Sequence, residues 1–95
     1  MTIHYQRSSE ALHARVGDDV VALHVRNGRC FGMERVTADI WRHLETAITF
    51  DQICERLMVE YDVDPETCRA DVKAILDTMR REGLVDELAT QENEH

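Results

Sequence analysis

The sequence predicts a single α+β domain in which an N-terminal three-stranded antiparallel sheet is followed by three α-helices. Between residues 11 and 33 apolar and polar side chains alternate with a period of two, and glycines interrupt the pattern, which is typical of short strands joined by turns. From residue 37 onward the apolar side chains recur at helical spacing. A chain of 95 residues can build one such domain around one modest core.

The first two predicted strands form a hairpin. Leu12, Ala14 and Val16 alternate with polar residues, and a turn at residues 17–19 leads into the second strand. Because side chains of a strand alternate between faces, each strand divides into an inward and an outward set. The inward set of the second strand is expected to be Val21, Leu23 and Val25. If Asp18 and Asp19 form a two-residue turn, the outward face is expected to hold His13 and His24 as cross-strand neighbours.

The third predicted strand, residues 29–33, follows a glycine-containing turn whose length decides which side chains face the core. A two-residue turn would point Phe31 and Met33 away from the core, because a shift of one residue exchanges the two faces. A three-residue loop ending in a glycine bulge pairs Phe31 with Leu23 and buries both Phe31 and Met33. Burial favours the three-residue loop, with Gly28 at positive φ.

The three helices are defined by their caps and apolar faces. The first is expected from about Thr37 to Glu45. The second begins after Thr49, which forms a capping box with Gln52. The third is capped by Asp64, has Pro65 at its first position, and ends before Gly83. The short break between the last two helices makes them a helix-turn-helix-like pair.

The composition of the chain bears on the type of partner that it can bind and on the cellular compartment in which we expect it. The formal net charge is −8, which disfavours nucleic acid because phosphate binding depends on Lys and Arg. The apolar runs are too short to span a membrane, and the first ten residues lack the apolar core of a secretion signal. We therefore expect a cytoplasmic protein. Residues 1–10 are expected to be a flexible arm, residues 11–85 the domain, and residues 86–95 a disordered acidic tail.

Nothing in the chain indicates an enzyme. Three cysteines, Cys30, Cys54 and Cys68, are widely spaced and form no CxxC pair, so neither a disulfide framework nor a zinc site is predicted. The four glycines are scattered and form no phosphate-binding loop. No nucleophile stands beside a base at a recognisable spacing. The sequence therefore predicts a binding protein that needs no metal or cofactor.

The edge of the third strand is the expected binding site. Because a helix rather than another strand follows it, its outer N–H and C=O groups are free to pair with an added peptide strand. The third helix would form the other wall, with apolar contacts from Val72, Leu76 and Met79 and polar contacts from Asp71, Lys73 and Arg80. The strand itself would contribute Arg29, Cys30, Phe31, Gly32 and Met33.

A family resemblance supports this interpretation. The run from Arg29 to Met33 after an Asn-Gly turn, the pair Ile40-Trp41, the run from Glu60 to Glu66, the pair Asp71-Val72 and the run from Gly83 to Val85 resemble PqqD-like proteins. Members of that family often carry an aromatic residue where Cys30 stands. The resemblance spans residues 12–85. It implies a winged-helix-like fold that serves as a recognition element, binding the leader of a ribosomally made precursor peptide by strand addition and presenting it to a modifying enzyme.

Several functions remain open at this stage. The resemblance implies either a lasso-peptide pathway, in which the partner would be a leader peptidase, or a PqqD-type chaperone that serves a radical-SAM enzyme. A free-standing acidic chain of this length favours the lasso-type role. The helix-turn-helix-like pair leaves a winged-helix DNA-binding regulator as one alternative. Self-association into a homodimer through the free strand edge is another.

Overall fold

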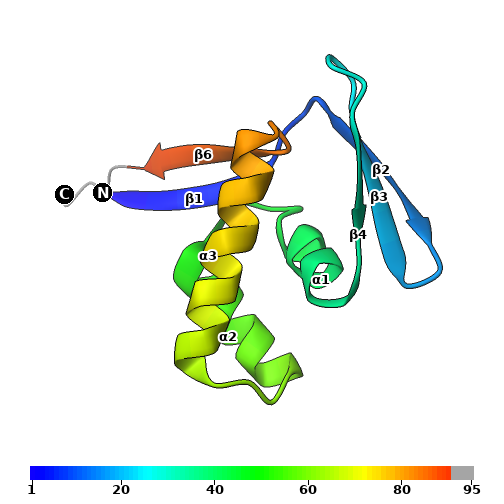
Figure 1. Cartoon of the computed structure of the whole chain (residues 1–95). Coiled ribbons are helices and arrows are strands. Elements are labelled where there is room, and N and C mark those ends of the chain that lie inside the picture. Colours follow the sequence, from blue (N-terminus) through cyan, green and yellow to red (C-terminus); the bar gives the residue numbers. More distant parts are fainter. Residues whose placement is uncertain (91–95) are drawn as a thin grey trace.

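Two small antiparallel sheets and three helices form the part of the chain that the computed structural model describes, residues 1–90 (Figure 1). The elements in chain order are β1 (Thr2–Arg7), β2 (Ala11–Val16), β3 (Asp19–His24), β4 (Cys30–Met33), α1 (Arg35–His43), β5 (Ile48–Thr49), α2 (Phe50–Glu60), α3 (Pro65–Arg81) and β6 (Val85–Thr90). The predicted α+β class and the predicted order of three strands and three helices are confirmed within residues 11–85.

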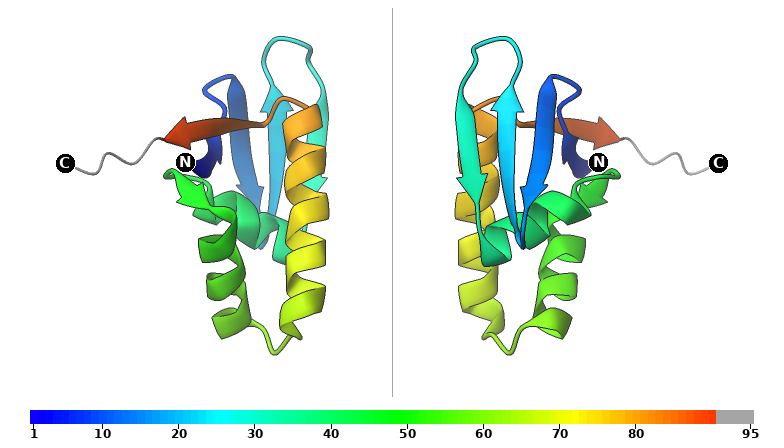
Figure 2. Two further views of the ribbon diagram at one scale, coloured as in Figure 1. Left: turned by 90° about the vertical axis from the view of Figure 1, so that its left-hand side faces the viewer. Right: turned by 90° about the vertical axis from the view of Figure 1, so that its right-hand side faces the viewer.

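The predicted three-stranded sheet has the strand order β2-β3-β4. The helices lie on one side of it, and α1 packs directly against β3. The opposite side of the sheet is turned toward the viewer in the right-hand view of Figure 2, where the helices lie behind the strands. β4 lies at one margin of this sheet, on the same side of the molecule as α3 in both views of Figure 2.

The second sheet, with the order β5-β1-β6, corrects the prediction for both termini. The expected flexible arm contains β1, which pairs with β6 from Thr2↔Thr90 to Arg7↔Val85. The expected disordered tail contributes residues 86–90 to β6, and its remainder, residues 91–95, lies outside the described part of the chain. Local sequence patterns do not reveal this pairing, because the two strands are separated by nearly the whole domain.

The β2–β3 hairpin turns one residue earlier than predicted. Val16 pairs with Asp19, so Gly17 and Asp18 form a two-residue turn, with Gly17 at a φ of +67°. Moving a two-residue turn by one position keeps Val21 and Leu23 on the same face as Leu12 and Ala14, so the hairpin as a whole turns its other face to the core. Val20, Ala22 and His24 are buried, whereas the expected inward residues Val21 and Val25 are exposed and Leu23 is only half-buried.

The register of β4 against β3 differs from the prediction by one residue. Phe31 pairs with Ala22 and Met33 with Val20, not with Leu23 and Val21 as predicted. Both still face the core side, because they pair with Ala22 and Val20, which lie on the buried face of the hairpin, and Met33 is buried. The connecting loop has four residues rather than three, since His24 N–H donates to the Arg29 carbonyl at 3.0 Å. Gly28 has the predicted positive φ, at +72°.

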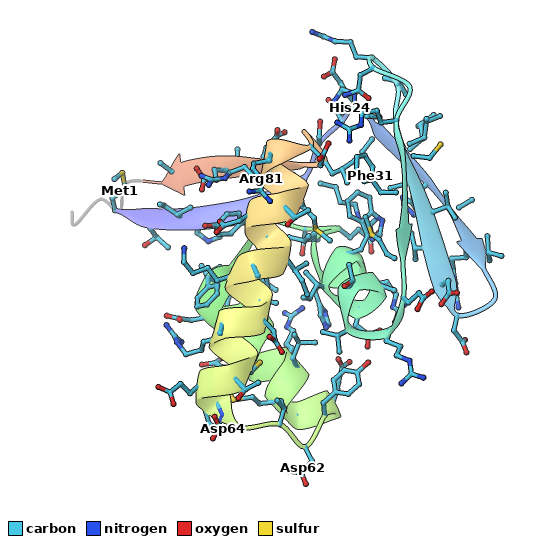
Figure 3. All side chains as sticks on the ribbon, viewed as in Figure 1. Met1, His24, Phe31, Asp62, Asp64 and Arg81 are labelled. Atoms are coloured by element: carbon cyan, nitrogen blue, oxygen red, sulfur yellow. The ribbon has the colours of Figure 1, made fainter. Side chains whose placement is uncertain are left out.

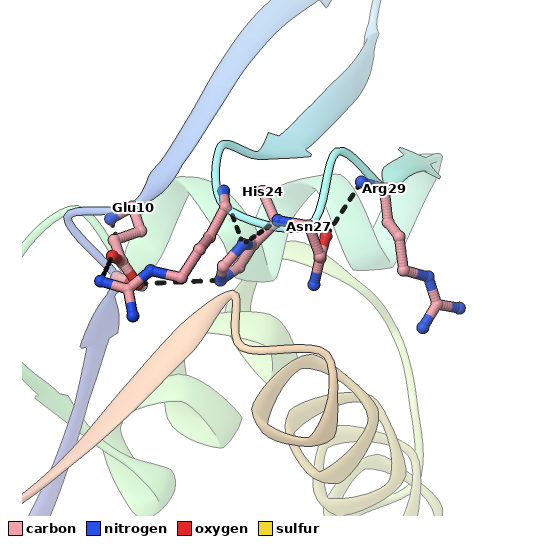
Figure 4. A network of polar contacts seen from close by, with 6 residues as sticks. Glu10, His24, Asn27 and Arg29 are labelled. Carbon is pink, nitrogen blue, oxygen red and sulfur yellow. Dashed lines mark hydrogen bonds and ion pairs between the residues drawn. The ribbon is translucent and has the colours of Figure 1, made fainter.

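A buried histidine organises this loop (Figure 4). His24 Nδ1 accepts hydrogen bonds from the backbone N–H groups of Arg26 and Asn27, at 3.2 and 3.4 Å. The Asn27 side chain accepts from the backbone N–H of Arg29 at 2.9 Å, and Glu10 forms an ion pair with Arg26. His24 therefore belongs to the inner face, and the expected outward pair of His13 and His24 is wrong, since His13 pairs with Ala22.

The helix caps of α2 and α3 match the sequence. Thr49 and Gln52 form the complete capping box of α2, and the Asp64 side chain accepts from the Thr67 N–H at 3.1 Å at the start of α3. Gly83, with a φ of +74°, ends α3 as predicted. α1 begins two residues earlier than expected, at Arg35, whose φ of +48° turns the chain sharply away from β4. No helix in the described residues is long and apolar enough to cross a membrane.

The core lies between the β2-β3-β4 sheet and the helices and is centred on Trp41, which has no exposed surface. His13 packs its ring edge-on against Trp41 at 5.7 Å, and Arg7 lies over the same ring at 5.0 Å. Burial, together with the charge of Arg7, lowers the pKa of His13 below its usual value. The other large, fully buried side chains are Ile40, Leu44, Ile48, Ile53, Leu57 and Leu84.

The three thiols are free and differ in accessibility, which gives a first testable prediction. Cys54 and Cys68 are buried and Cys30 is exposed. Burial raises the pKa of Cys54 to about 11, so its reactive thiolate is scarce at neutral pH. Iodoacetamide at pH 8 is expected to alkylate Cys30 in the folded protein and the other two only in denaturant. Mass spectrometry of peptides after timed alkylation would count the labels, and rapid labelling of Cys54 would contradict the structure.

Candidate functional site

The outer edge of β4 is unpaired in the described part of the chain, as predicted. β4 pairs with β3 on one side only. Hydrogen-bonded and non-hydrogen-bonded pairs alternate along an antiparallel ladder. The bond from His24 N–H to the Arg29 carbonyl therefore assigns the ladder bonds to residues 29, 31 and 33. The backbone N–H and C=O groups of Cys30 and Gly32 consequently point outward, where an added strand would meet them.

A groove of about 270 Å³ lies between β4 and α3. Figure 3 shows Phe31 on the side of β4 that faces the upper part of α3. On the helix, the lining residues recur at positions 74, 75, 78 and 82, which lie on one face of α3 at helical spacing. The lining residues are Phe31, Gly32, Met33, Thr37, Ala74, Ile75, Thr78, Met79, Glu82 and Leu84. The groove is therefore mostly apolar and runs beside the free strand edge.

An ion pair bridges one end of the groove. Arg29, just before β4, forms an ion pair with Glu82 at the end of α3, with 2.9 Å between Arg29 Nη1 and Glu82 Oε1. The Arg29 guanidinium also lies 5.5 Å from the ring centre of Phe31. This pair connects the two walls and helps to set their separation at that end, although an exposed ion pair contributes little to stability by itself.

Four of the eleven predicted site residues line this groove: Phe31, Gly32, Met33 and Met79. Arg29 bridges the groove end, and Cys30 is exposed on the same strand. On α3, Val72 and Leu76 are buried in the core. Asp71 and Val72 also line a separate hollow of about 300 Å³ beside Val36 and Tyr61.

The two predicted basic contacts lie away from the groove. Lys73 lines a hollow beside β1, together with Ile3 and Tyr5. Arg80 forms an ion pair with Glu87 of β6 at 3.0 Å. Helical geometry accounts for this placement, since residues 73 and 80 share a face that is turned away from residues 74, 75 and 78. The structure therefore brings the strand residues to the groove but places Lys73 and Arg80 beside the second sheet.

The groove residues that the sequence prediction missed are Thr37, Ala74, Ile75, Thr78, Glu82 and Leu84. A signal for them was present. Beside the most apolar stripe of α3 runs a second stripe of mixed character, Ala74, Ile75 and Thr78, with one small, one large apolar and one polar residue. The prediction assigned the wall to the more apolar stripe, of which Val72 and Leu76 fill the core and Met79 lines the groove. A half-apolar stripe beside a core stripe is the pattern of a surface that borders a groove.

The site offers backbone hydrogen bonds, an apolar groove and few ionisable groups, which suits the binding of an extended peptide. Within residues 1–90 no group of three or more metal-ligating side chains is arranged to hold a metal ion. The carboxylate nearest the groove, Glu82, is engaged by Arg29. These features match the binding chemistry of strand addition, in which main-chain bonds give affinity and pockets for alternate side chains give specificity.

Comparisons with known proteins agree with this geometry. A structure described as TbiB1 in complex with the TbiA(beta) leader peptide is similar to the chain, with a TM-score of 0.81 and 30% sequence identity, over 85% of this chain and 94% of that chain. A lasso peptide synthetase B1 complexed with its leader peptide has the same fold, with a TM-score of 0.77 and 20% identity, over 86% of this chain and 96% of that chain.

Among curated proteins no match was found. The model of the family described as coenzyme PQQ synthesis protein D (PqqD) matches residues 19–85. These residues include β3, β4, all three helices and therefore both walls of the groove. The match covers well over half of the chain, and the fold and the resemblance drawn from the residues agree with it. The chain belongs to the PqqD family.

Proposed function

We propose that this protein binds the leader region of a ribosomally synthesised precursor peptide by adding it as a strand to β4. The observation that carries the proposal is the outward-facing backbone of Cys30 and Gly32 directly beside an apolar groove. Each added main-chain hydrogen bond contributes about 0.5–1.5 kcal/mol net. Alternate side chains of the leader enter the groove between β4 and α3, where Phe31, Ile75, Thr78 and Met79 select them.

We further propose that the protein acts as a non-catalytic recognition protein in the cytoplasm and presents the bound leader to a leader peptidase of a lasso-peptide pathway. Two similar structures support this choice, since both hold a leader peptide and one of them is described as a lasso peptide synthetase B1. The second candidate is a PqqD-type chaperone that delivers its peptide to a radical-SAM enzyme, which the family match favours. A DNA-binding role has no comparable support, and the net charge of −8 disfavours it.

A direct titration tests the proposal. A fluorescein-labelled synthetic leader, from the precursor gene adjacent to the gene for this chain, would be titrated with the protein and followed by anisotropy. Saturable binding with a Kd of about 1 μM or tighter is expected. A scrambled leader of equal composition and a labelled DNA duplex serve as controls. Absence of leader binding, or equal binding of the scrambled peptide, would refute the proposed function.

Filling the groove is expected to weaken the binding of the leader. Ala74 is exposed on the groove face of α3, so the indole of an Ala74→Trp variant would occupy space that leader side chains require. The Kd is expected to rise by about tenfold, with the midpoint of thermal unfolding nearly unchanged, because the site is on the surface. Ala70→Trp is the matched control, since Ala70 is exposed on the same helix outside the groove lining. Equal affinities for the two variants would argue against this binding surface.

A further inference from the structure

The face of the β2-β3-β4 sheet opposite the helices carries an apolar patch. Eight large apolar side chains are exposed among the described residues, and four of them, Leu12, Val16, Val21 and Val25, lie on these strands or just after β3. Their exposed fractions are 57%, 61%, 39% and 51%. A concentration of this kind on one face of a small protein is typical of an interaction surface.

The strand register gathers these side chains into one surface, here called the outer face. Directly paired residues of an antiparallel sheet share a face. Leu12 pairs with Leu23, which in turn pairs with Cys30, and Ala14 pairs with Val21, which in turn pairs with Gly32. The outer face therefore extends without a charged residue across these two rows, from β2 to the free edge at β4.

The outer face continues into the proposed peptide site. A guest strand paired to β4 would extend the same sheet, and its side chains would alternate between the groove and the outer face. The outward-directed side chains of the guest would lie beside Cys30 and Gly32. Bound leader and recognition protein would then present one composite surface, which a third molecule could contact on both components at once.

Charge favours a different protein over a second copy as the third molecule. Asp18 and Asp19 border the outer face at the tip of the β2–β3 hairpin, and the chain has a net charge of −8. Stacking two such faces would bring like charges together, which opposes self-association. A partner with an apolar centre and a basic rim would be complementary to this face.

We infer that the outer face of the β2-β3-β4 sheet is the docking surface for the maturation enzyme, which contacts Leu12, Val16 and Val21 together with the outward side chains of the bound leader. The inference rests on the proposed function. According to this inference, the two faces of the sheet bind different molecules. The groove side selects the leader, and the outer side recruits the enzyme that acts on it.

The test separates recruitment from leader binding. Leu12→Lys places a positive charge on the β2 side of the outer face, far from the β4 edge, and Val16→Thr removes apolar surface while retaining a β-branched side chain. Val59→Lys and Val59→Thr are the matched controls, because Val59 is 87% exposed on α2. Each full-length variant would be assayed for leader affinity by anisotropy and for stimulation of leader cleavage by the purified leader peptidase encoded beside it.

Leu12→Lys is expected to raise the protein concentration required for half-maximal cleavage by about tenfold, and Val16→Thr by about threefold, with leader Kd within about twofold of wild type. The Val59 variants are expected to behave as wild type. Wild-type cleavage by both outer-face variants would overturn the inference. So would a parallel loss of leader affinity, or a wild-type dimer that Leu12→Lys dissociates in analytical ultracentrifugation, since the occupant would then be a second copy.

Failure of the proposed function itself is visible without any variant. A wild-type protein that does not bind the leader refutes both proposals, whereas a wild-type protein that binds leader but shows no outer-face effect refutes only recruitment. Circular dichroism of each variant establishes that it is folded. If Leu12→Lys does not fold, Val16→Thr alone decides, because it keeps strand propensity and changes only an exposed side chain.

Discussion

A Gly32→Pro variant is expected to bind the leader at least about tenfold more weakly than wild type while retaining its fold. The register directs the N–H of Gly32 away from β3, so proline removes no ladder bond within the sheet. Proline is tolerated at such edge positions for this reason. It does remove a donor that the added strand requires, and its ring obstructs the approach of the guest backbone.

Gly32→Ala is the matched control. No atom lies within 4 Å of the position that a Cβ would take at residue 32, so alanine fits without displacement and retains the N–H. Its leader affinity is expected to remain within about twofold of wild type. Anisotropy titrations give both affinities, and circular dichroism gives the helix content. A folded Gly32→Pro variant with wild-type affinity would exclude pairing at this position. The groove between β4 and α3 would then be the remaining candidate for the leader-binding surface.

Trp41→Ala is expected to lower the free energy of unfolding by about 3–5 kcal/mol. Trp41 has no exposed surface, its ring contacts His13 of β2, and the guanidinium of Arg7 of β1 lies over the ring at 5.0 Å. The ring therefore connects α1 to both sheets. Removing it leaves a cavity that the short helices cannot easily fill. For a domain of this size the loss is a large fraction of the total stability.

Urea denaturation followed by circular dichroism measures this effect, because the variant lacks the only tryptophan for fluorescence. Val59→Ala, at an exposed apolar position, is the control and is expected to change the unfolding free energy by less than about 0.5 kcal/mol. A loss below about 1 kcal/mol in Trp41→Ala would mean that the site collapses around the missing ring, and that the core is less closely packed than its burial indicates.

The helices were the most predictable part of the fold. Their boundaries depend on local chemistry, such as the Thr49–Gln52 capping box, the Asp64 cap and the αL glycine at position 83, all of which the structure contains. α1 was less predictable because its N-cap, Glu34, makes no side-chain cap bond. Helix starts without a capping side chain leave little trace in a sequence.

The strands required information that local patterns lack. Neither turn position decides which face of the β2–β3 hairpin meets the helices, and the exposed Val21 and Val25 show the alternation expected of a core-facing set. Burial of His24 depends on the hydrogen bonds that its ring accepts from two backbone N–H groups of the loop. The β1–β6 pairing depends on residues at opposite ends of the chain. Each of these is a tertiary effect that overrides a local preference.

The candidate site was predictable in outline. That β4 would have a free edge beside α3 followed from the order of the elements. Which face of α3 borders the edge did not, because the choice between the stripe of Val72 and Leu76 and the stripe of Ala74, Ile75 and Thr78 depends on the rotation of the helix about its axis. A rotation of one residue, about 100°, replaces most of the side chains that form the wall.

The pairing of Thr2 with Thr90 places the beginning and the end of the described chain side by side, on the far side of the molecule from β4 (Figure 1). A domain with adjacent termini can be inserted into a loop of another protein, or circularly permuted, without separating its strands. This chain could therefore be grafted onto a modifying enzyme through either end and keep its groove accessible, which makes it a portable module for directing that enzyme to a chosen peptide.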